Sequence, residues 1–282
     1  MRVIHNISPI KEYLSEIHRQ SKQVGLVPTM GALHDGHANL IRQALIENDI
    51  VICSIYVNPA QFNNPEDLQN YPVSMEKDLD LLKNLGCHCA FCPNNLTMYP
   101  EKSLLLTDMG YLDQIMEGKF RPGHFNGVRL IIAKLFNIIN PDNAYFGKKD
   151  FQQLAVIRQL VRELAFGVTI RPIETVREPD GLAKSSRNLL LNERSRKDAS
   201  MIFKVLLAAQ KQLKTGMSPT NVKHMVQNMF NNNNNIGELE YFEIVNKNTL
   251  IDMEQIEDPE KVQLCIAGYF ANIRLIDNIS LI

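Results

Sequence analysis

The sequence predicts an α/β protein in which a parallel sheet carries helices on both faces, followed by a smaller α+β part. Short apolar runs alternate with helix-periodic segments over the first 175 of the 282 residues, as in a parallel sheet joined by crossover helices. The run 49–57, "DIVICSIYV", is almost continuously apolar, which is typical of a strand covered on both faces. Hydrophobic residues make up 45% of the chain, enough to build a globular core.

The elements of the first part follow from hydrophobic spacing. In 38–47, "ANLIRQALIE", apolar residues recur at helical intervals, whereas 24–27 is a short unbroken apolar run. Applied along the chain, this criterion predicts helix 11–21, strand 24–27, helix 38–47, strand 49–57, helix 75–85, strand 87–93, helix 125–139, strand 143–147, helix 151–166 and strand 168–173.

The pattern changes after the sheet region. Pro179, Asp180 and Gly181 are a turn signal, and we place a domain boundary near Val176. The elements predicted beyond it are helices near 194–215 and 221–230, a solvated loop at 231–235 ("NNNNN"), and strands of a small sheet at 239–245 and 262–270.

Composition excludes several classes of function. With 30 basic and 31 acidic residues the net charge is −1, so no bulk field attracts nucleic acid or an anionic membrane. No apolar stretch approaches the roughly 18 residues that span a bilayer, and the N-terminus lacks the apolar core of a signal peptide. Five cysteines without an export signal favour reduced thiols and a cytoplasmic location.

The stretch "VPTMGALHDGH" places a glycine turn between a strand and a helix. Ligands of parallel α/β sheets bind beyond the carboxyl ends of strands, and anions bind at helix N-termini. Met30, Gly31 and Ala32 would let the backbone turn tightly, and His34 and His37 could donate to phosphate oxygens. A tight turn with two exposed histidines is the alternative, but the order of strand, turn and helix favours a binding site.

Two further segments carry cations at loop positions. In "YFGKKDFQQL" a strand ends at Gly147, and Lys148 and Lys149 follow it, where a lysine is well placed on phosphate. Asp150 with Gln153 also forms a capping box, which is a sufficient structural reason for that aspartate. The second segment, "AKSSRN" at 183–188, puts two cations and two hydroxyls after a turn, although alone it would be interpreted as a polar surface loop.

The segment "VNPAQF" follows the most apolar strand, so Asn58 and Gln61 should reach the same edge of the sheet. An uncharged amide suits a hydroxyl or carboxylate, and a loop amide facing water is equally compatible with the local sequence. Cysteines 87, 89 and 92 with His88 suggest zinc, but the C-x-C-x₂-C spacing is not the usual structural pattern. Buried small residues explain these cysteines better.

"HDGH" resembles the HIGH signature of nucleotidyltransferases and class I aminoacyl-tRNA synthetases, and "AKSSRN" lies where their KMSKS loop would lie. Six segments in the expected order, "PTMGALHDGH", "VNPAQF", "RPGHFNGV", "YFGKKDFQQL", "DGLAKSSRN" and "RLIDN", together resemble the pantoate–β-alanine ligase family. The resemblance implies a Rossmann-like nucleotide- and pantoate-binding domain at 1–175, a lid domain at 176–282, and a homodimer.

The resemblance also implies site residues. His37, His34, Lys149 and Arg187 would be catalytic. The ATP site would comprise Met30, Gly31, Ala32, Leu33, His34, Asp35, Gly36, His37, Gly147, Lys148, Lys149, Asp150, Val176, Lys184, Ser185, Ser186 and Arg187. Pantoate and β-alanine would meet Gln61, Gln153, Met30 and Asn58.

Asp78 resembles an aspartate associated with Mg²⁺ in the family. Its preceding neighbour is often acidic there but is Lys77 here. Val73 and Asn126 stand where arginine is common, and neither change removes a group that the chemistry requires.

The expected reaction is ATP-dependent condensation of pantoate with β-alanine through a pantoyl adenylate, releasing pyrophosphate and AMP. The substrates are small molecules, and neither nucleic acid nor membrane is expected as a partner. Two alternatives remain: a nucleotidyltransferase of the same superfamily acting on another small acid or phosphate, and a non-catalytic nucleotide-binding module.

Overall fold

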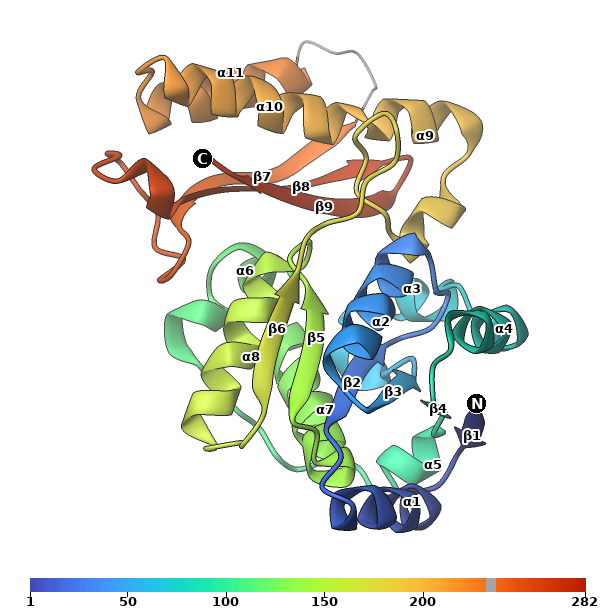
Figure 1. Cartoon of the computed structure of the whole chain (residues 1–282). Helices are drawn as coiled ribbons and strands as arrows, with labels where there is room; N and C mark the ends of the chain where they lie inside the picture. The colour runs from blue at the N-terminus through green and yellow to red at the C-terminus, as the bar shows by residue number, and fades with distance from the viewer. Residues whose placement is uncertain (232–236) are drawn as a thin grey trace. The chain divides into compact units, whose positions relative to one another are not determined.

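The computed structural model describes residues 1–231 and 237–282. It divides into two compact units. Unit 1 comprises Met1–Lys148 and Gln152–Glu174, and unit 2 comprises Lys149–Phe151 and Thr175–Ile282 (Figure 1). Most of the predicted asparagine loop, 231–235, lies outside the described residues, and Asn231 is the last residue of a helix.

Unit 1 is built on a six-stranded sheet with the order β1-β4-β3-β2-β5-β6, in which every neighbouring pair is parallel. The strands are β1 (Arg2–Ile4), β2 (Val24–Thr29), β3 (Ile50–Ile55), β4 (Cys89–Phe91), β5 (Asn143–Gly147) and β6 (Thr169–Ile173). From β2 the chain adds strands in one direction, and from β5 in the other. The strand order therefore reverses between β2 and β5, where ligands of such sheets bind.

Helices flank this sheet (Figure 1). Their bounds are α1 (Ile7–Arg19), α2 (Asp35–Glu47), α3 (Pro65–Gln69), α4 (Met75–Leu85), α5 (Asn95–Met98), α6 (Met116–Phe120), α7 (His124–Ile139) and α8 (Phe151–Glu163), with 3₁₀ turns η1 (Pro59–Gln61) and η2 (Gly110–Asp113). α2 packs against β2, β3 and β5, and its buried Ile41 and Ala44 join Val27, Val51 and Tyr145 in one apolar cluster. Full burial of a valine or isoleucine side chain contributes about 1.5–3 kcal/mol.

The α/β prediction is confirmed, and α4 and β5 have the predicted bounds. α1 was predicted to start at Lys11 but begins at Ile7, because Pro9 falls in the first turn, where its missing N–H costs nothing. The short β1 was not predicted.

Unit 2 contains a three-stranded antiparallel sheet, β7 (Glu238–Asn246), β8 (Val262–Phe270) and β9 (Ile273–Ser280). Its helices are α9 (Glu193–Ala199), α10 (Met201–Lys214) and α11 (Pro219–Asn231), with 3₁₀ turns η3 (Ser186–Leu190) and η4 (Pro259–Lys261). The single helix predicted over 194–215 is divided at Ser200. In the described part of the chain, 1–231 and 237–282, no helix is long and apolar enough to cross a bilayer.

Candidate active site

The turn after β2 has an unusual backbone. Gly31 has φ +83° and Ala32 has φ +48°. This region of backbone conformation is unfavourable for residues other than glycine. The Thr29 hydroxyl accepts from the N–H of Gly31 at 3.3 Å and donates to the Ser54 carbonyl oxygen at 2.7 Å. The turn therefore lies at the carboxyl ends of β2 and β3, beside the point where strand order reverses.

The two histidines of "HDGH" form the start of α2. His34 is the N-cap residue, and its Nδ1 accepts from the N–H of Gly36 at 3.1 Å. His37 returns the interaction, since its Nδ1 accepts from the N–H of His34 at 3.3 Å. The half-buried rings lie with their centroids 4.1 Å apart. An Nδ1 that accepts a hydrogen bond places the ring proton on Nε2, so in each neutral ring Nδ1 is the acceptor and Nε2–H is the donor.

Asp78, on α4, is joined to the same turn. Its Oδ2 accepts from the N–H of Ala32 at 2.8 Å, and its Oδ1 accepts from the N–H of Leu33 at 2.7 Å. The residue is only 2% exposed. Burial raises the pKa of its carboxyl group, and the N–H groups of Leu33 and Ala32 oppose that rise.

A chain of amides follows β3. Asn58 is fully buried and donates to Gln61 Oε1 at 3.1 Å, and Gln61 Nε2 lies 3.0 Å from the sulfur of Met30. Tyr99 donates its hydroxyl to Asn58 Oδ1 at 2.9 Å. Burial raises the pKa of Tyr99 to about 12, so this donor stays protonated at neutral pH. The structure thus brings together three residues predicted to meet pantoate or β-alanine: Met30, Asn58 and Gln61.

α7 contacts the main chain of Gln61. His124 Nδ1 lies 2.8 Å from the Gln61 carbonyl oxygen, and His124 Nε2 lies 3.1 Å from Arg121 Nη1. Gly127 packs so closely on η1 that a Cβ there would lie 2.1 Å from the Ala60 carbonyl oxygen. Tyr99, Arg121 and His124 are not among the site residues predicted from the sequence. The segment "RPGHFNGV" contained the signal for the last two, and nothing in the sequence indicated Tyr99.

The end of β5 carries the second predicted nucleotide segment. Lys148 forms an ion pair with Glu174, and its N–H donates to the Ile173 carbonyl oxygen at 2.8 Å. Gln153 is half-buried on α8. Its neighbour Gln152 is buried and has a structural role, donating to the carbonyl oxygens of Leu112 and Ile115.

Unit 2 contains the remaining predicted phosphate-binding residues. The Lys184 ammonium lies 2.9 Å from Glu178 Oε1, and the Lys184 N–H donates to the Val176 carbonyl oxygen at 2.9 Å. Ser185 caps η3 by accepting from the N–H of Arg187 at 3.3 Å. The Lys149 ammonium lies 3.8 Å from Asp150 Oδ2.

Strand β9 anchors both of these segments. Arg177, at the base of the turn that precedes Lys184, donates to both oxygens of Asp277 at 2.6 and 2.9 Å. Asn278 donates to the Lys149 carbonyl oxygen at 2.8 Å. Asp277 and Asn278 are 2% and 7% exposed. The segment "RLIDN" contained them, but the strand itself was not predicted.

The cysteines have no metal-binding geometry. Cys87, Cys89 and Cys92 are buried free thiols, and burial raises their pKa values to about 11, 12 and 11. Among the described residues, 1–231 and 237–282, no group of three or more His, Cys, Asp and Glu side chains could hold a metal ion.

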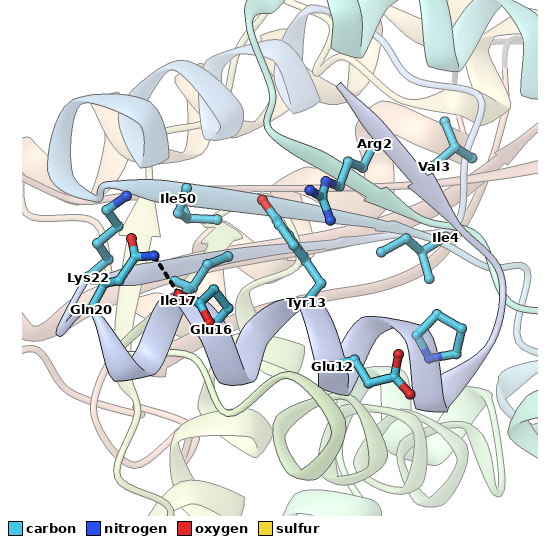
Figure 2. Close-up of a pocket in the computed structure, with 11 residues that line it drawn as sticks. Arg2, Val3, Ile4, Glu12, Tyr13, Glu16, Ile17, Gln20, Lys22 and Ile50 are labelled. Atoms are coloured by element: carbon cyan, nitrogen blue, oxygen red, sulfur yellow. Dashed lines mark hydrogen bonds between the residues drawn. The ribbon is translucent and has the colours of Figure 1, made fainter.

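A separate cavity lies elsewhere in unit 1. Figure 2 shows it between β1 and α1, with the Arg2 guanidinium 4.5 Å from the centroid of the Tyr13 ring. Its volume is about 810 Å³. Arg2, Lys22 and Ile50 lie at or just before the first residues of parallel strands. The cavity is therefore at the amino end of the sheet, opposite the edge that carries His34 and Gln61.

Residues 2–280 match the family model described as pantoate-β-alanine ligase. The chain belongs to the pantoate–β-alanine ligase family. Among its curated relatives, the pantothenate synthetase of Cytophaga hutchinsonii is 45% identical over 280 residues, covering 99% of each chain. That of Bacteroides thetaiotaomicron is 44% identical over 279 residues, covering 99% of this chain and 98% of the relative.

Solved structures of pantoate–β-alanine ligases share the fold. The pantothenate synthetase of Thermus thermophilus matches with a TM-score of 0.92 at 37% identity, covering 100% of this chain and 99% of that one. The ligase of Francisella tularensis, complexed with β-γ ATP and β-alanine, matches with a TM-score of 0.85 at 34% identity, covering 100% and 98%. The resemblance noted in the six sequence segments is thus confirmed over the whole chain, while the roles of individual residues stay predictions.

Proposed function

We propose that this chain is a pantoate–β-alanine ligase that forms pantothenate, AMP and pyrophosphate from pantoate, β-alanine and ATP. Full-length similarity to relatives with this activity in their names carries the proposal. It is supported by the arrangement at the carboxyl edge of the sheet, where two imidazoles cap a helix start and an uncharged amide chain lies next to the same turn.

The first half of the reaction activates the acid. A pantoate carboxylate oxygen attacks the α-phosphorus of ATP, the bond to the bridging oxygen breaks, and pyrophosphate leaves. Negative charge grows on the phosphate oxygens, so the protein must position the reactants and supply hydrogen-bond donors and positive charge. The Nε2–H groups of His34 and His37 suit this purpose, and Lys149, Lys184 and Arg187 would add charge from the second unit. The remaining predicted nucleotide contacts are backbone and side-chain groups of the turn at 30–37, of 147–150 and of 176–187.

The second half forms the amide. The neutral amine of β-alanine attacks the carbonyl carbon of the adenylate, AMP leaves with the bonding electron pair, and the amine loses a proton. Gln61, Asn58 and Gln153 would orient the two small substrates through their amides. No nucleophilic side chain is needed. Unit 2 would act as a lid that protects the adenylate from water, and we expect a homodimer in the cytoplasm.

Mg²⁺ is implied by the family, and the residues at the predicted position do not fit it as a resident metal. Asp78, the predicted metal residue, is buried, and each of its oxygens accepts a backbone N–H. The exposed Lys77 precedes it where a second acid would help. We therefore assign Mg²⁺ to the substrate, as the cation that ATP carries with it.

An omission assay tests the function. Purified protein with ATP and Mg²⁺ is assayed for AMP and pyrophosphate with pantoate and β-alanine together, and with each left out. We expect AMP release to need both acids. Pyrophosphate release that is independent of pantoate would favour another nucleotidyltransferase, and ATP binding without turnover would favour a non-catalytic module.

A further inference from the structure

The link between α4 and the turn after β2 has no role in the reaction as derived so far. Asp78 uses each carboxylate oxygen once, on the consecutive N–H groups of Ala32 and Leu33, at 2.8 and 2.7 Å. Those two amides belong to the turn that leads directly into His34. We propose that Asp78 is a positioning residue that holds this turn in its binding conformation, and that it does not ligate Mg²⁺. This inference rests on the proposed function, because the turn is the predicted ATP segment.

The backbone of the turn needs such a partner. Gly31 and the adjacent Ala32 both have positive φ, and strained backbone persists only where the surroundings fix it. Hydrogen bonds to a carboxylate are stronger than bonds between neutral groups. Two of them on adjacent amides fix the orientation of both peptide planes.

The same contacts prevent a cation from reaching the Asp78 carboxylate. Asp78 is 2% exposed, and each of its two oxygens already accepts a backbone N–H. A carboxylate retains further lone pairs after two hydrogen bonds, but a hydrated Mg²⁺ demands octahedral space around it. The two N–H groups donate to the carboxylate oxygens, and such bonds stabilise the charged form.

The position of the turn explains why its shape matters. Leu33 N–H is held by Asp78, and the next N–H, of His34, is held by His37 Nδ1. Three consecutive amides, at positions 32, 33 and 34, are thus fixed by side chains before α2 begins. Loss of the Asp78 contacts would free the backbone at positions 32 and 33, directly before His34. It would not remove any group predicted to touch ATP.

The test compares Asp78→Asn and Asp78→Ala with Asp80→Asn and Asp80→Ala. Asp80 lies on the same helix and is exposed, so its variants control for charge and helix propensity. Hydrogen exchange of the ligand-free proteins is measured over residues 30–37. We expect exchange at positions 32 and 33 to be roughly tenfold faster or more in both Asp78 variants, in keeping with loss of a charge-assisted bond, and unchanged in the Asp80 variants. Unaltered exchange in Asp78→Asn would overturn the proposal.

Kinetics separate positioning from metal binding. We expect the KM for ATP to rise in the Asp78 variants, more for alanine than for asparagine, because asparagine keeps one acceptor oxygen. The Mg²⁺ concentration for half-maximal rate at a fixed ratio of ATP to KM should be unchanged. Recovery of activity by excess Mg²⁺ would show a ligand role and defeat the proposal.

A measurement on the wild type tests the proposal even if the Asp78 variants do not fold. Mg²⁺ alone, without nucleotide, should leave exchange over 75–85 and 30–37 unchanged, whereas protection by Mg²⁺ alone would contradict the inference. If the omission assay failed for the wild type, the proposed function would fall. The exchange data would still decide whether Asp78 holds the turn.

Discussion

Asn278 donates its side-chain amide to the main-chain carbonyl oxygen of Lys149 at 2.8 Å, although 129 positions separate the two residues in the sequence. Its neighbour Asp277 binds Arg177 through both carboxylate oxygens. Two adjacent residues of β9 thus fix two segments that are far apart in the chain and are both predicted to hold phosphate. Within unit 2, β9 is the common support for Lys149 and for the turn before Lys184.

Replacing Asn278 by alanine should weaken ATP use, because the Lys149 carbonyl and the Gln263 amide, which donates to Asn278 Oδ1 at 2.7 Å, both lose a partner. We expect kcat/KM for ATP to fall about tenfold, which corresponds to about 1.4 kcal/mol. Steady-state kinetics at saturating pantoate and β-alanine measure it. Gln210→Ala is the matched control, since Gln210 also donates to a carbonyl oxygen, that of Ser280, at 2.8 Å. Equal losses in the two variants would show a general loss of stability instead.

Replacing His37 by alanine should slow adenylation by about 10²–10³, since removal of one donor to developing charge costs about 2.7–4 kcal/mol. His37→Asn is the informative companion. Its Oδ1 can replace Nδ1 as the acceptor for the His34 N–H, while the Nε2–H donor is lost. We expect both variants to be slow and only the alanine variant to lose stability, by about 0.5–2 kcal/mol for a lost cap. Pyrophosphate release and thermal unfolding measure the two effects. A His37→Asn rate within threefold of wild type would exclude the donor role.

Replacing Glu178 by glutamine should strengthen ATP binding. Its carboxylate lies 2.9 Å from the Lys184 ammonium and competes with phosphate for that cation. Partly exposed pairs are worth about 0.2–1 kcal/mol, so we expect the KM for ATP to fall by up to about fivefold. Glu193→Gln, at an exposed acid in the first turn of α9, controls for the change in net charge. An unchanged or higher KM in Glu178→Gln would mean that the pair orients Lys184 and does not compete with ATP.

Replacing Gly127 by alanine should disturb the substrate amides. The new Cβ would lie 2.1 Å from the Ala60 carbonyl oxygen, so η1 must move, and Asn58 and Gln61 would move with it. We expect a loss of about 1–3 kcal/mol in stability, as for other overpacked sites, and a raised KM for pantoate or β-alanine. Urea unfolding and steady-state kinetics measure the two effects. Gly167→Ala is the control, because no atom lies within 4 Å of the Cβ position there. If both variants had the stability and KM values of the wild type, the close packing of α7 on η1 would not be needed to position the substrate amides.

Elements with a clear hydrophobic period were predictable, and polar or short elements were not. α4 and β5 have the predicted bounds because apolar spacing and flanking turn residues agree. β9 was missed because its buried Asp277 and Asn278 make the strand look polar in sequence. β1 has only three residues, and two of them are exposed, so it gives no pattern to detect.

The site was predictable to the level of segments. Strand ends and glycine turns placed the "HDGH" turn and "VNPAQF" at one edge of the sheet, and the contact of Gln61 with Met30 follows that expectation. The side chains that hold these two segments in place come from distant parts of the sequence. Asp78 reaches Leu33 across 45 positions and Tyr99 reaches Asn58 across 41, and local pattern contains no information at such separations.

The bond from Asn278 reaches a main-chain oxygen, which every amino acid provides. A substitution at position 149 would therefore leave this bond in place, whatever it did to phosphate binding, whereas loss of the donor at 278 would remove it. Recombination between relatives at residue 175 would still join the two segments, provided that the parent supplying residues 176–282 has an amide side chain at this place in its last strand.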